Sequence, residues 1–283
     1  MKSASPWEYI MSNEEMAQDE VQNGHSFLKA LSIQTRVIGA LIMRELHTRY
    51  GRENIGYLWM ILEPALLAAA VAAFHSGSKN HYSTDILPVP FTIVGYTTYY
   101  MFRSIVNRAE GTIESNQSLL YHRRVTILDL SIARTILEFL SVLFTMILLI
   151  ALASLFGLGN MPHRWLYLLG GFMLMTWLCF GLALIVTSWT YDNRTAARLV
   201  HPMTYLALPL SGAFVILSWV PEPYRSLLYW FPMVQIFEMI RYGQFQYAEN
   251  IYFDVPYLIL VCAILTYTGL ILMRRLRHHI HLR

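Results

Sequence analysis

The chain has 283 residues, of which 55% are hydrophobic and 14% are charged, and its formal net charge is +3. This composition is too apolar for an ordinary soluble domain, so it predicts an all-α protein that crosses a membrane several times. The weak positive charge gives no reason to expect a nucleic-acid partner.

Residues 1–30 form a polar segment without the apolar core of a cleavable signal sequence, and we expect a cytoplasmic tail. Its acidic residues are Glu8, Glu14, Glu15, Asp19 and Glu20. An amphipathic helix is predicted to follow over residues 31–50, lying on the cytoplasmic membrane surface. Its apolar side carries Leu31, Ile38, Ile42 and Leu46, and its polar side carries Arg36, Arg44 and His47.

The stretch Arg44–Pro64, RELHTRYGRENIGYLWMILEP, leads from this helix into the first apolar run. Arginines before a membrane span and aromatic residues at its boundary are favoured by anionic lipid head groups. A juxtamembrane cluster of charges that only fixes the orientation of the chain would give the same pattern. Both interpretations, a surface-lying helix and an orientation signal, stay open.

Six apolar runs approach the roughly 20 residues that a helix needs to cross the hydrocarbon core. We expect spans at about 57–74, 86–106, 132–156, 166–189, 199–220 and 255–273. The fifth run contains His201, Pro202 and Pro209, which predict a kinked helix. Cys179 and Cys262 lie inside apolar runs, which indicates buried, reduced thiols.

The distribution of basic residues predicts the orientation. With the N-terminus in the cytoplasm, all of the 21 lysines and arginines fall on the inner side except Lys79, Arg164, Arg225 and Arg241. Positive residues concentrate in cytoplasmic loops, so both termini are expected in the cytoplasm. Residues 276–283 then form a basic cytoplasmic tail, whose three histidines would bind metal only adventitiously.

Two connections are longer than a helical bundle requires. Residues 107–131 predict a short polar helix with a small apolar patch, which would either dock on a partner or remain an ordinary solvated loop. Residues 220–253 are apolar but interrupted by prolines, and we expect short re-entrant or surface-lying periplasmic helices before the last span. A seventh span over 227–246 is the alternative, although it would place the C-terminal arginines outside.

The chain lacks the chemistry of an ATPase. A phosphate-binding loop needs a lysine directly after glycine, whereas the lysines here follow Met1, Leu28 and Ser78. Any ATP and Mg²⁺ would therefore be bound by a separate subunit. His201 and Ser211 are nearly three helical turns apart, which argues against a hydrolase pair. We expect no catalytic, cofactor or metal site on this chain.

Three ionisable residues fall within the predicted spans, where such groups are costly and mark candidate functional sites. Arg134 and Glu138 have i, i+4 spacing and would pair with each other near the cytoplasmic end of the third span. Glu63 precedes the helix-breaking Pro64, and it would either bond a neighbouring helix or line a hydrated path.

The Arg44–Pro64 stretch resembles the permease subunits of ABC-2 type polysaccharide exporters. The residues that carry the resemblance are the Arg-x-Leu-x-x-Arg-Tyr start, the Gly-Tyr-Leu-Trp centre and the Glu-Pro ending. They are most similar to the capsular polysaccharide export branch (KpsM-like), with O-antigen and teichoic-acid permeases as relatives. Glu53 and Asn54 depart from the pattern, which leaves docking at those positions open.

This resemblance implies a bacterial inner-membrane homodimer that binds two copies of an ABC ATPase and exports lipid-linked capsular polysaccharide to the periplasm. A periplasmic adaptor and an outer-membrane export protein are implied as further partners. The residues that would receive the ATPase stroke are Arg44, Glu110, Glu114, Leu119, Leu120, Arg123 and Arg124. Glu63 and Pro64 are candidate gating residues.

Aromatic side chains suit a sugar conduit, because tyrosine offers a flat apolar surface and one polar tip to successive sugars. The candidate conduit residues are Tyr96, Tyr99, Tyr100, Phe102, Trp177, Phe180 and Tyr205. An aromatic belt at the membrane interface would give a similar pattern. The candidates for attracting an acidic glycan at the cytoplasmic mouth are Arg49, Arg52, Arg103 and Arg108. The alternatives are an exporter of O-antigen, teichoic acid or another lipophilic cargo, and a membrane enzyme acting on lipid-linked sugars.

Overall fold

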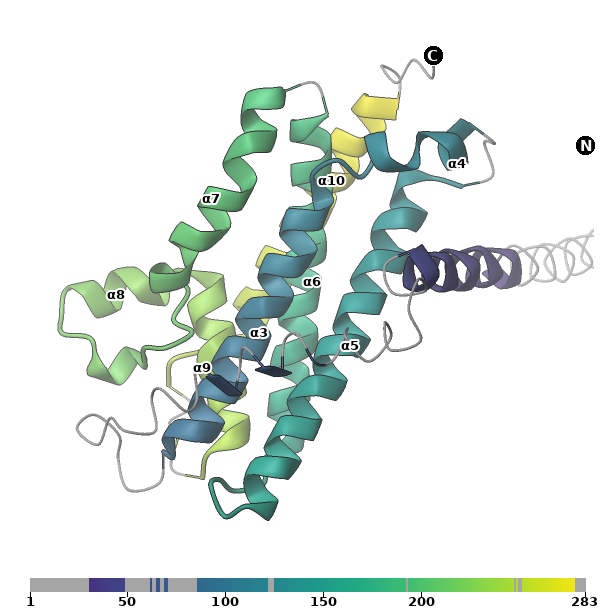
Figure 1. Cartoon of the computed structure of the whole chain (residues 1–283). Helices are drawn as coiled ribbons and strands as arrows, with labels where there is room; N and C mark the ends of the chain where they lie inside the picture. Colours follow the sequence, from purple (N-terminus) through teal and green to yellow (C-terminus); the bar gives the residue numbers. More distant parts are fainter. Residues whose placement is uncertain are drawn as a thin grey trace, which may run out of the picture.

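The computed structural model describes residues 31–48, 62, 65–66, 69–70, 86–121, 125–191, 193–246, 248 and 251–277, and these residues are helical or irregular. The predicted tail over 1–30, most of the predicted first span and the last six residues lie outside the described part. Figure 1 shows α4, the start of α7 and the C-terminal end of α10 at one end of the bundle, which we call the α4 end. A helix over residues 31–48 lies beside α5 (Figure 1).

Helix α3, Pro88–Ala109, occupies the middle of the bundle between α5, α6 and α7 (Figure 1). The helix begins with a proline. The first N–H groups of a helix have no partner within it, so a residue without an N–H is accommodated there with little loss of free energy. Gly95 brings α3 close to the turn after α7, because a Cβ at this position would lie 2.3 Å from the Ala213 carbonyl oxygen.

Three of the described helices are long and apolar enough to cross a membrane: α5, Ile127–Leu155; α6, Trp165–Thr190; and α10, whose apolar part is Val255–Leu276. Helix α5 begins five residues before the predicted span, because Thr126 and Asp129 form a capping box. The Asp129 N–H donates to Thr126 Oγ1 at 3.2 Å, and the Thr126 N–H donates to Asp129 Oδ2 at 2.8 Å.

Helix α7, Arg194–Leu210, ends ten residues before the predicted end of the fifth span. Its interior contains Pro202 and Pro209, which remove backbone donors, and Gly212 then adopts φ +79°, a left-handed conformation suited to glycine. The chain continues irregularly to a short 3₁₀ helix, η2, Leu217–Trp219.

The segment before the last helix contains two separate helices, α8, Tyr224–Tyr229, and α9, Pro232–Gln244. The alternative single span over 227–246 is therefore interrupted at Trp230–Phe231. Helix α9 packs tightly on α6, because Cβ atoms at Gly171 and Gly243 would lie 2.5 Å from Ile240 and 2.4 Å from Leu168. Small residues allow two helices to approach closely within a membrane.

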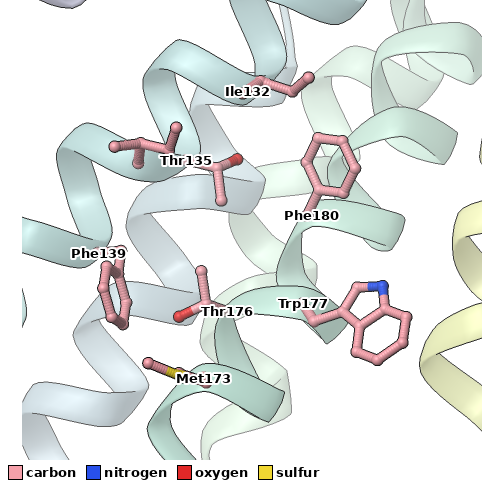
Figure 2. Close-up of a pocket in the computed structure, with 8 residues that line it drawn as sticks. Ile132, Thr135, Phe139, Met173, Thr176, Trp177 and Phe180 are labelled. Carbon is pink, nitrogen blue, oxygen red and sulfur yellow. The ribbon is translucent and has the colours of Figure 1, made fainter. Parts of the chain in front are cut away.

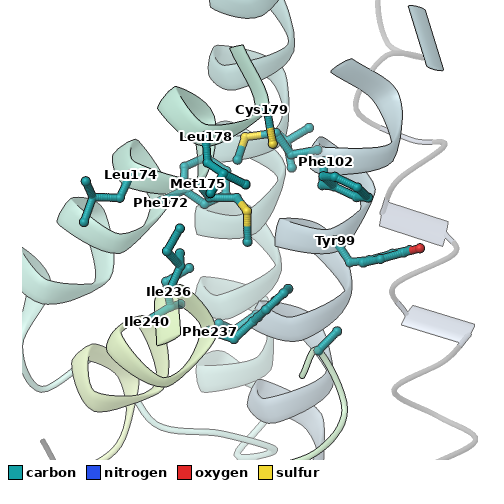
Figure 3. Close-up of a cluster of buried hydrophobic side chains, with 14 of the residues drawn as sticks. Tyr99, Phe102, Phe172, Leu174, Met175, Leu178, Cys179, Ile236, Phe237 and Ile240 are labelled. Atoms are coloured by element: carbon teal, nitrogen blue, oxygen red, sulfur yellow. The ribbon is translucent and has the colours of Figure 1, made fainter. Parts of the chain in front are cut away.

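The buried apolar side chains form a large cluster among α3, α5, α6, α7, α9 and α10, part of which is drawn in Figure 3. A smaller cluster lies near the α4 end. It joins Leu41 of the 31–48 helix and Leu120 of α4 to Leu184 of α6 and to Met273 and Leu276 of α10. The 31–48 helix is thus packed against the bundle through apolar contacts.

Candidate functional site

The segment between α3 and α5 folds into a compact turn at the α4 end. Gly111 adopts φ +65°, which reverses the chain after α3, and a 3₁₀ turn, η1, Glu114–Asn116, leads into α4, Gln117–Tyr121. The buried Asn116 donates from Nδ2 to the Thr112 carbonyl oxygen at 2.9 Å, which fixes the turn from inside. The sequence prediction of a short helix within 107–131 agrees with this arrangement.

Polar side chains attach the 31–48 helix to this turn and to α5. Arg44 Nη1 donates to Asn116 Oδ1 at 2.9 Å, and Gln34 Nε2 donates to Asp129 Oδ1. Asn116 therefore bonds both its own turn and the 31–48 helix, so the two segments cannot separate without breaking a partly buried hydrogen bond.

Arg134 of α5 connects the three segments. Its Nε lies 3.3 Å from Glu45 Oε1 of the 31–48 helix, and its Nη1 donates to Thr112 Oγ1 at 2.8 Å and to the Arg108 carbonyl oxygen at 3.1 Å. Glu138, which is 5% exposed, pairs with Arg108 Nε at 3.1 Å. The ion pairs of Arg134 and Glu138 thus join different segments, whereas the sequence predicted a pair between these two residues within α5.

We call Glu45, Arg108, Thr112, Arg134 and Glu138 the junction. The side chains of Arg134 and Glu45 are 17% and 14% exposed, whereas that of Arg108 is 37% exposed, so solvent screens its pair with Glu138 more strongly. Together these contacts join the turn after α3, the 31–48 helix and α5. A displacement of the turn after α3 would consequently be passed to the 31–48 helix and to α5.

Several of the predicted coupling residues contact the segments that the junction joins. Glu110 Oε2 lies 3.5 Å from His201 Nε2, which links the turn to α7. Leu120 is buried in the smaller cluster, Leu119 packs against that cluster, and Glu114 is exposed. Arg123 and Arg124 lie outside the described residues.

Five of the seven predicted conduit residues gather on α3 and α7. The Tyr99 hydroxyl donates to the Thr204 carbonyl oxygen, and its ring lies 5.8 Å from that of Phe102. Tyr99 and Phe102 are 3% and 7% exposed and belong to the main core cluster (Figure 3). Tyr96 and Tyr100 are half-buried, with their rings 6.4 Å apart. Tyr205 is 56% exposed, so among these five it offers the most surface to a ligand.

The other two predicted conduit residues, Trp177 and Phe180, lie on α6 in an apolar groove between α5 and α6 (Figure 2). Trp177 Nε1 donates to Thr266 Oγ1 of α10 at 3.0 Å. The structure therefore places the seven residues in two groups on different helices.

Two of the predicted mouth arginines are described, and both contact neighbouring side chains. The Arg103 guanidinium lies 4.7 Å from the centre of the Tyr205 ring, and Arg108 bonds Ser104 and Glu138. The Arg103–Tyr205 pair forms a polar and aromatic surface between α3 and α7. Arg49, Arg52, Glu63 and Pro64 lie outside the described residues.

Sequence reasoning missed two polar networks at the other end of the bundle, of which the first is buried. Arg241 and Glu238 of α9 pair at 3.0 Å and bond the turn after α7. Arg164 donates to the carbonyl oxygens of Tyr242 and Phe245 at 2.9 and 3.0 Å and so caps the end of α9. A signal was present, because Glu238 and Arg241 have i, i+3 spacing within an otherwise apolar segment.

The helical bundle, with three described helices long and apolar enough to cross a membrane, is that of a helical membrane protein. Residues 36–245 match the family model described as "ABC-2 type transporter". The chain therefore belongs to the ABC-2 type transporter family, as its sequence resemblance predicted.

Several curated relatives are similar to it over most of their length. The chain is 37% identical to the capsule polysaccharide export inner-membrane protein CtrC of Neisseria meningitidis serogroup B, over 84% of this chain and 89% of that protein. It is 33% identical to the capsule polysaccharide export inner-membrane protein BexB of Haemophilus influenzae, over 88% and 94%. It is 31% identical to the polysialic acid transport protein KpsM of Escherichia coli, over 74% and 81%.

Proposed function

We propose that this chain is the permease subunit of an ATP-driven exporter that carries lipid-linked capsular polysaccharide from the cytoplasm to the periplasm. The names of the relatives support the cargo and the inner-membrane location. The observation that carries the mechanism is the junction, because it ties a turn at the bundle end to the 31–48 helix and to α5.

In this proposal both termini are cytoplasmic, and α3, α5, α6, α7 and α10 are five of six spans. The span over 57–74 completes the set. Two copies of the chain form the transport path about a two-fold axis, and two ABC ATPase subunits supply the energy. A periplasmic adaptor and an outer-membrane export protein would continue the path.

ATP-driven closure of the ATPase pushes on the turn at 110–121. The junction passes this displacement to the 31–48 helix and α5, and the contact between Glu110 and His201 passes it to α7. Helix α7 is able to respond because Pro202 and Pro209 weaken its backbone hydrogen bonding and Gly212 ends it.

The surface formed by Arg103 and Tyr205 is the part of the described conduit that a sugar would contact. An arginine attracts an acidic glycan, and a tyrosine ring packs on the apolar face of a sugar without holding it tightly. Tyr99 then acts by holding α3 and α7 together through its bond to Thr204.

Co-purification tests the proposal directly. We expect the detergent-solubilised chain, expressed with an ABC ATPase subunit, to capture that subunit and to support ATP hydrolysis. A chain that moves cargo without any ATPase, or that captures none, would contradict the mechanism. Reporter fusions that place the C-terminus in the periplasm would contradict the topology.

A pair of matched variants tests the conduit. Tyr205→Ala is expected to reduce polymer export severalfold while leaving ATPase binding intact, because it removes an exposed ring. Tyr99→Phe keeps the buried ring and loses only one hydrogen bond, so we expect a small loss of thermal stability and near-normal export. Normal export in Tyr205→Ala would remove Tyr205 from the conduit.

A further inference from the structure

The groove between α5 and α6 has a volume of about 340 Å³ and an almost wholly apolar lining (Figure 2). On α5 its wall runs from Ile132 to Phe139 at helical spacing, and on α6 it runs from Met173 to Phe180. Both helices are long and apolar enough to cross a membrane, so in the proposed topology the groove lies at the depth of the hydrocarbon layer.

Polar atoms in the groove wall are already bonded within the protein. Thr135 Oγ1 donates to the Ser131 carbonyl oxygen at 2.8 Å, and Thr176 Oγ1 donates to the Phe172 carbonyl oxygen at 2.8 Å. Trp177 Nε1 donates to Thr266 Oγ1. The wall therefore presents carbon surface to its ligand, which favours an acyl chain over any polar group.

The groove is held at its sides by packed side chains. The Phe139 ring of α5 lies 5.6 Å from the Phe172 ring of α6, and Phe180 packs against the smaller cluster near the α4 end. Because these contacts fix the two walls, α5 and α6 cannot close on each other without repacking. An acyl chain that fills the groove supplies the dispersion contacts that the side chains of the groove walls otherwise lack.

Helix α10, which Trp177 of the groove contacts through Thr266, carries a basic side chain toward the α4 end. Met273 and Leu276 of α10 belong to the cluster that Phe180 contacts, and Arg274, between them in sequence, is exposed. Arg274 is eight residues beyond Thr266, about 12 Å along α10. In the proposed topology this places Arg274 at the cytoplasmic head-group layer, where arginines attract anionic lipids.

We propose that the groove between α5 and α6 binds one acyl chain of an anionic membrane phospholipid, whose phosphate is attracted by Arg274. The head-group part rests on the proposed cytoplasmic position of the α10 end. The acyl-chain part rests on the groove alone. The bound acyl chain fills the space between α5 and α6 and so completes their packing.

Native mass spectrometry of the purified chain in detergent, with phosphatidylglycerol or phosphatidylcholine added, tests lipid retention without reference to transport. We expect the wild type to retain one phosphatidylglycerol per chain. Ile136→Trp fills the groove and is expected to lose it, whereas Leu140→Trp, at an exposed position of α5 outside the groove, is expected to keep it. Equal retention by the two variants, or none by the wild type, would overturn the acyl-chain site.

Arg274→Gln tests the head group. It should weaken phosphatidylglycerol binding about fivefold, the worth of one basic residue near the membrane surface, and leave phosphatidylcholine binding unchanged. An unaltered preference for phosphatidylglycerol would remove Arg274 from the site while leaving the acyl-chain claim standing.

The fluorescence of Trp177 provides a direct probe of the bound acyl chain. Phosphatidylglycerol brominated in its acyl chains, added at one equivalent, should quench wild-type fluorescence more than that of Trp177→Phe, because Trp177 lines the groove. Equal quenching in both proteins would contradict the site. Cross-linking of Ile136→Cys to a second copy would also overturn it, since a protein helix would then occupy the groove.

Discussion

The buried pair Glu238–Arg241 gives a sharp test of how the turn after α7 is held. The two side chains are 4% and 3% exposed. Arg241 Nη1 donates to Glu238 Oε1 and to the Val215 carbonyl oxygen, both at 3.0 Å, and Nη2 donates to the Ala213 carbonyl oxygen at 2.9 Å. One guanidinium thus fixes the turn against α9.

Replacing this arginine by methionine keeps much of the side-chain volume and removes the charge. The Glu238 carboxylate then stays buried without its cation, and breaking a buried ion pair in this way costs about 3–5 kcal/mol. At roughly 3 °C per kcal/mol for a chain of this size, the Tm should fall by about 10–15 °C. The assay is thermal unfolding of the detergent-solubilised chain, followed by tryptophan fluorescence.

Two further variants separate the stranded charge from lost packing. Glu238→Gln combined with Arg241→Met removes both charges, so we expect it to recover a substantial part of the loss. Arg198→Met removes an exposed arginine of α7, and its Tm should change by no more than about 3 °C. The reasoning is refuted if Arg241→Met is no less stable than the double variant.

Two other predictions follow from packing and from the junction. Gly243→Ala places a Cβ 2.4 Å from the Leu168 backbone nitrogen, so it should destabilise the protein by about 1–3 kcal/mol in the same thermal unfolding assay. Gly39→Ala is the control, because a Cβ there would have nothing within 4 Å and should not change the stability. Equal unfolding temperatures of the two variants would contradict the close packing of α9 on α6. Glu45→Arg and Arg134→Glu should each lower the amount of polymer exported per ATP hydrolysed, and combining the two substitutions, which restores the ion pair with its charges exchanged, should recover part of the loss. If the double variant exports as little as the worse single variant, the pair is not a coupling contact.

The positions of the long helices followed from sequence with small errors. The predicted spans 132–156, 166–189 and 255–273 lie within or close to α5, α6 and α10, because a continuous apolar run is a local property that burial in lipid selects. The early start of α5 was also readable in the sequence, since Thr126 and Asp129 have capping-box spacing. The early end of α7 depends on a turn whose conformation is stabilised by contacts with α9.

The sequence by itself determined that this protein is helical, lies in a membrane and belongs to the ABC-2 type transporter family. The length of an apolar run and the overall composition depend only on the order of residues in the chain, so they can be determined without knowing which helices pack together. Only the tertiary structure decided which partner each charge takes and which tyrosines are buried. Arg134 pairs with Glu45, 89 positions earlier in the chain, and Tyr99 is buried while Tyr205 is exposed. These outcomes depend on which helices pack together, and the apolar pattern of any one helix does not specify its neighbours.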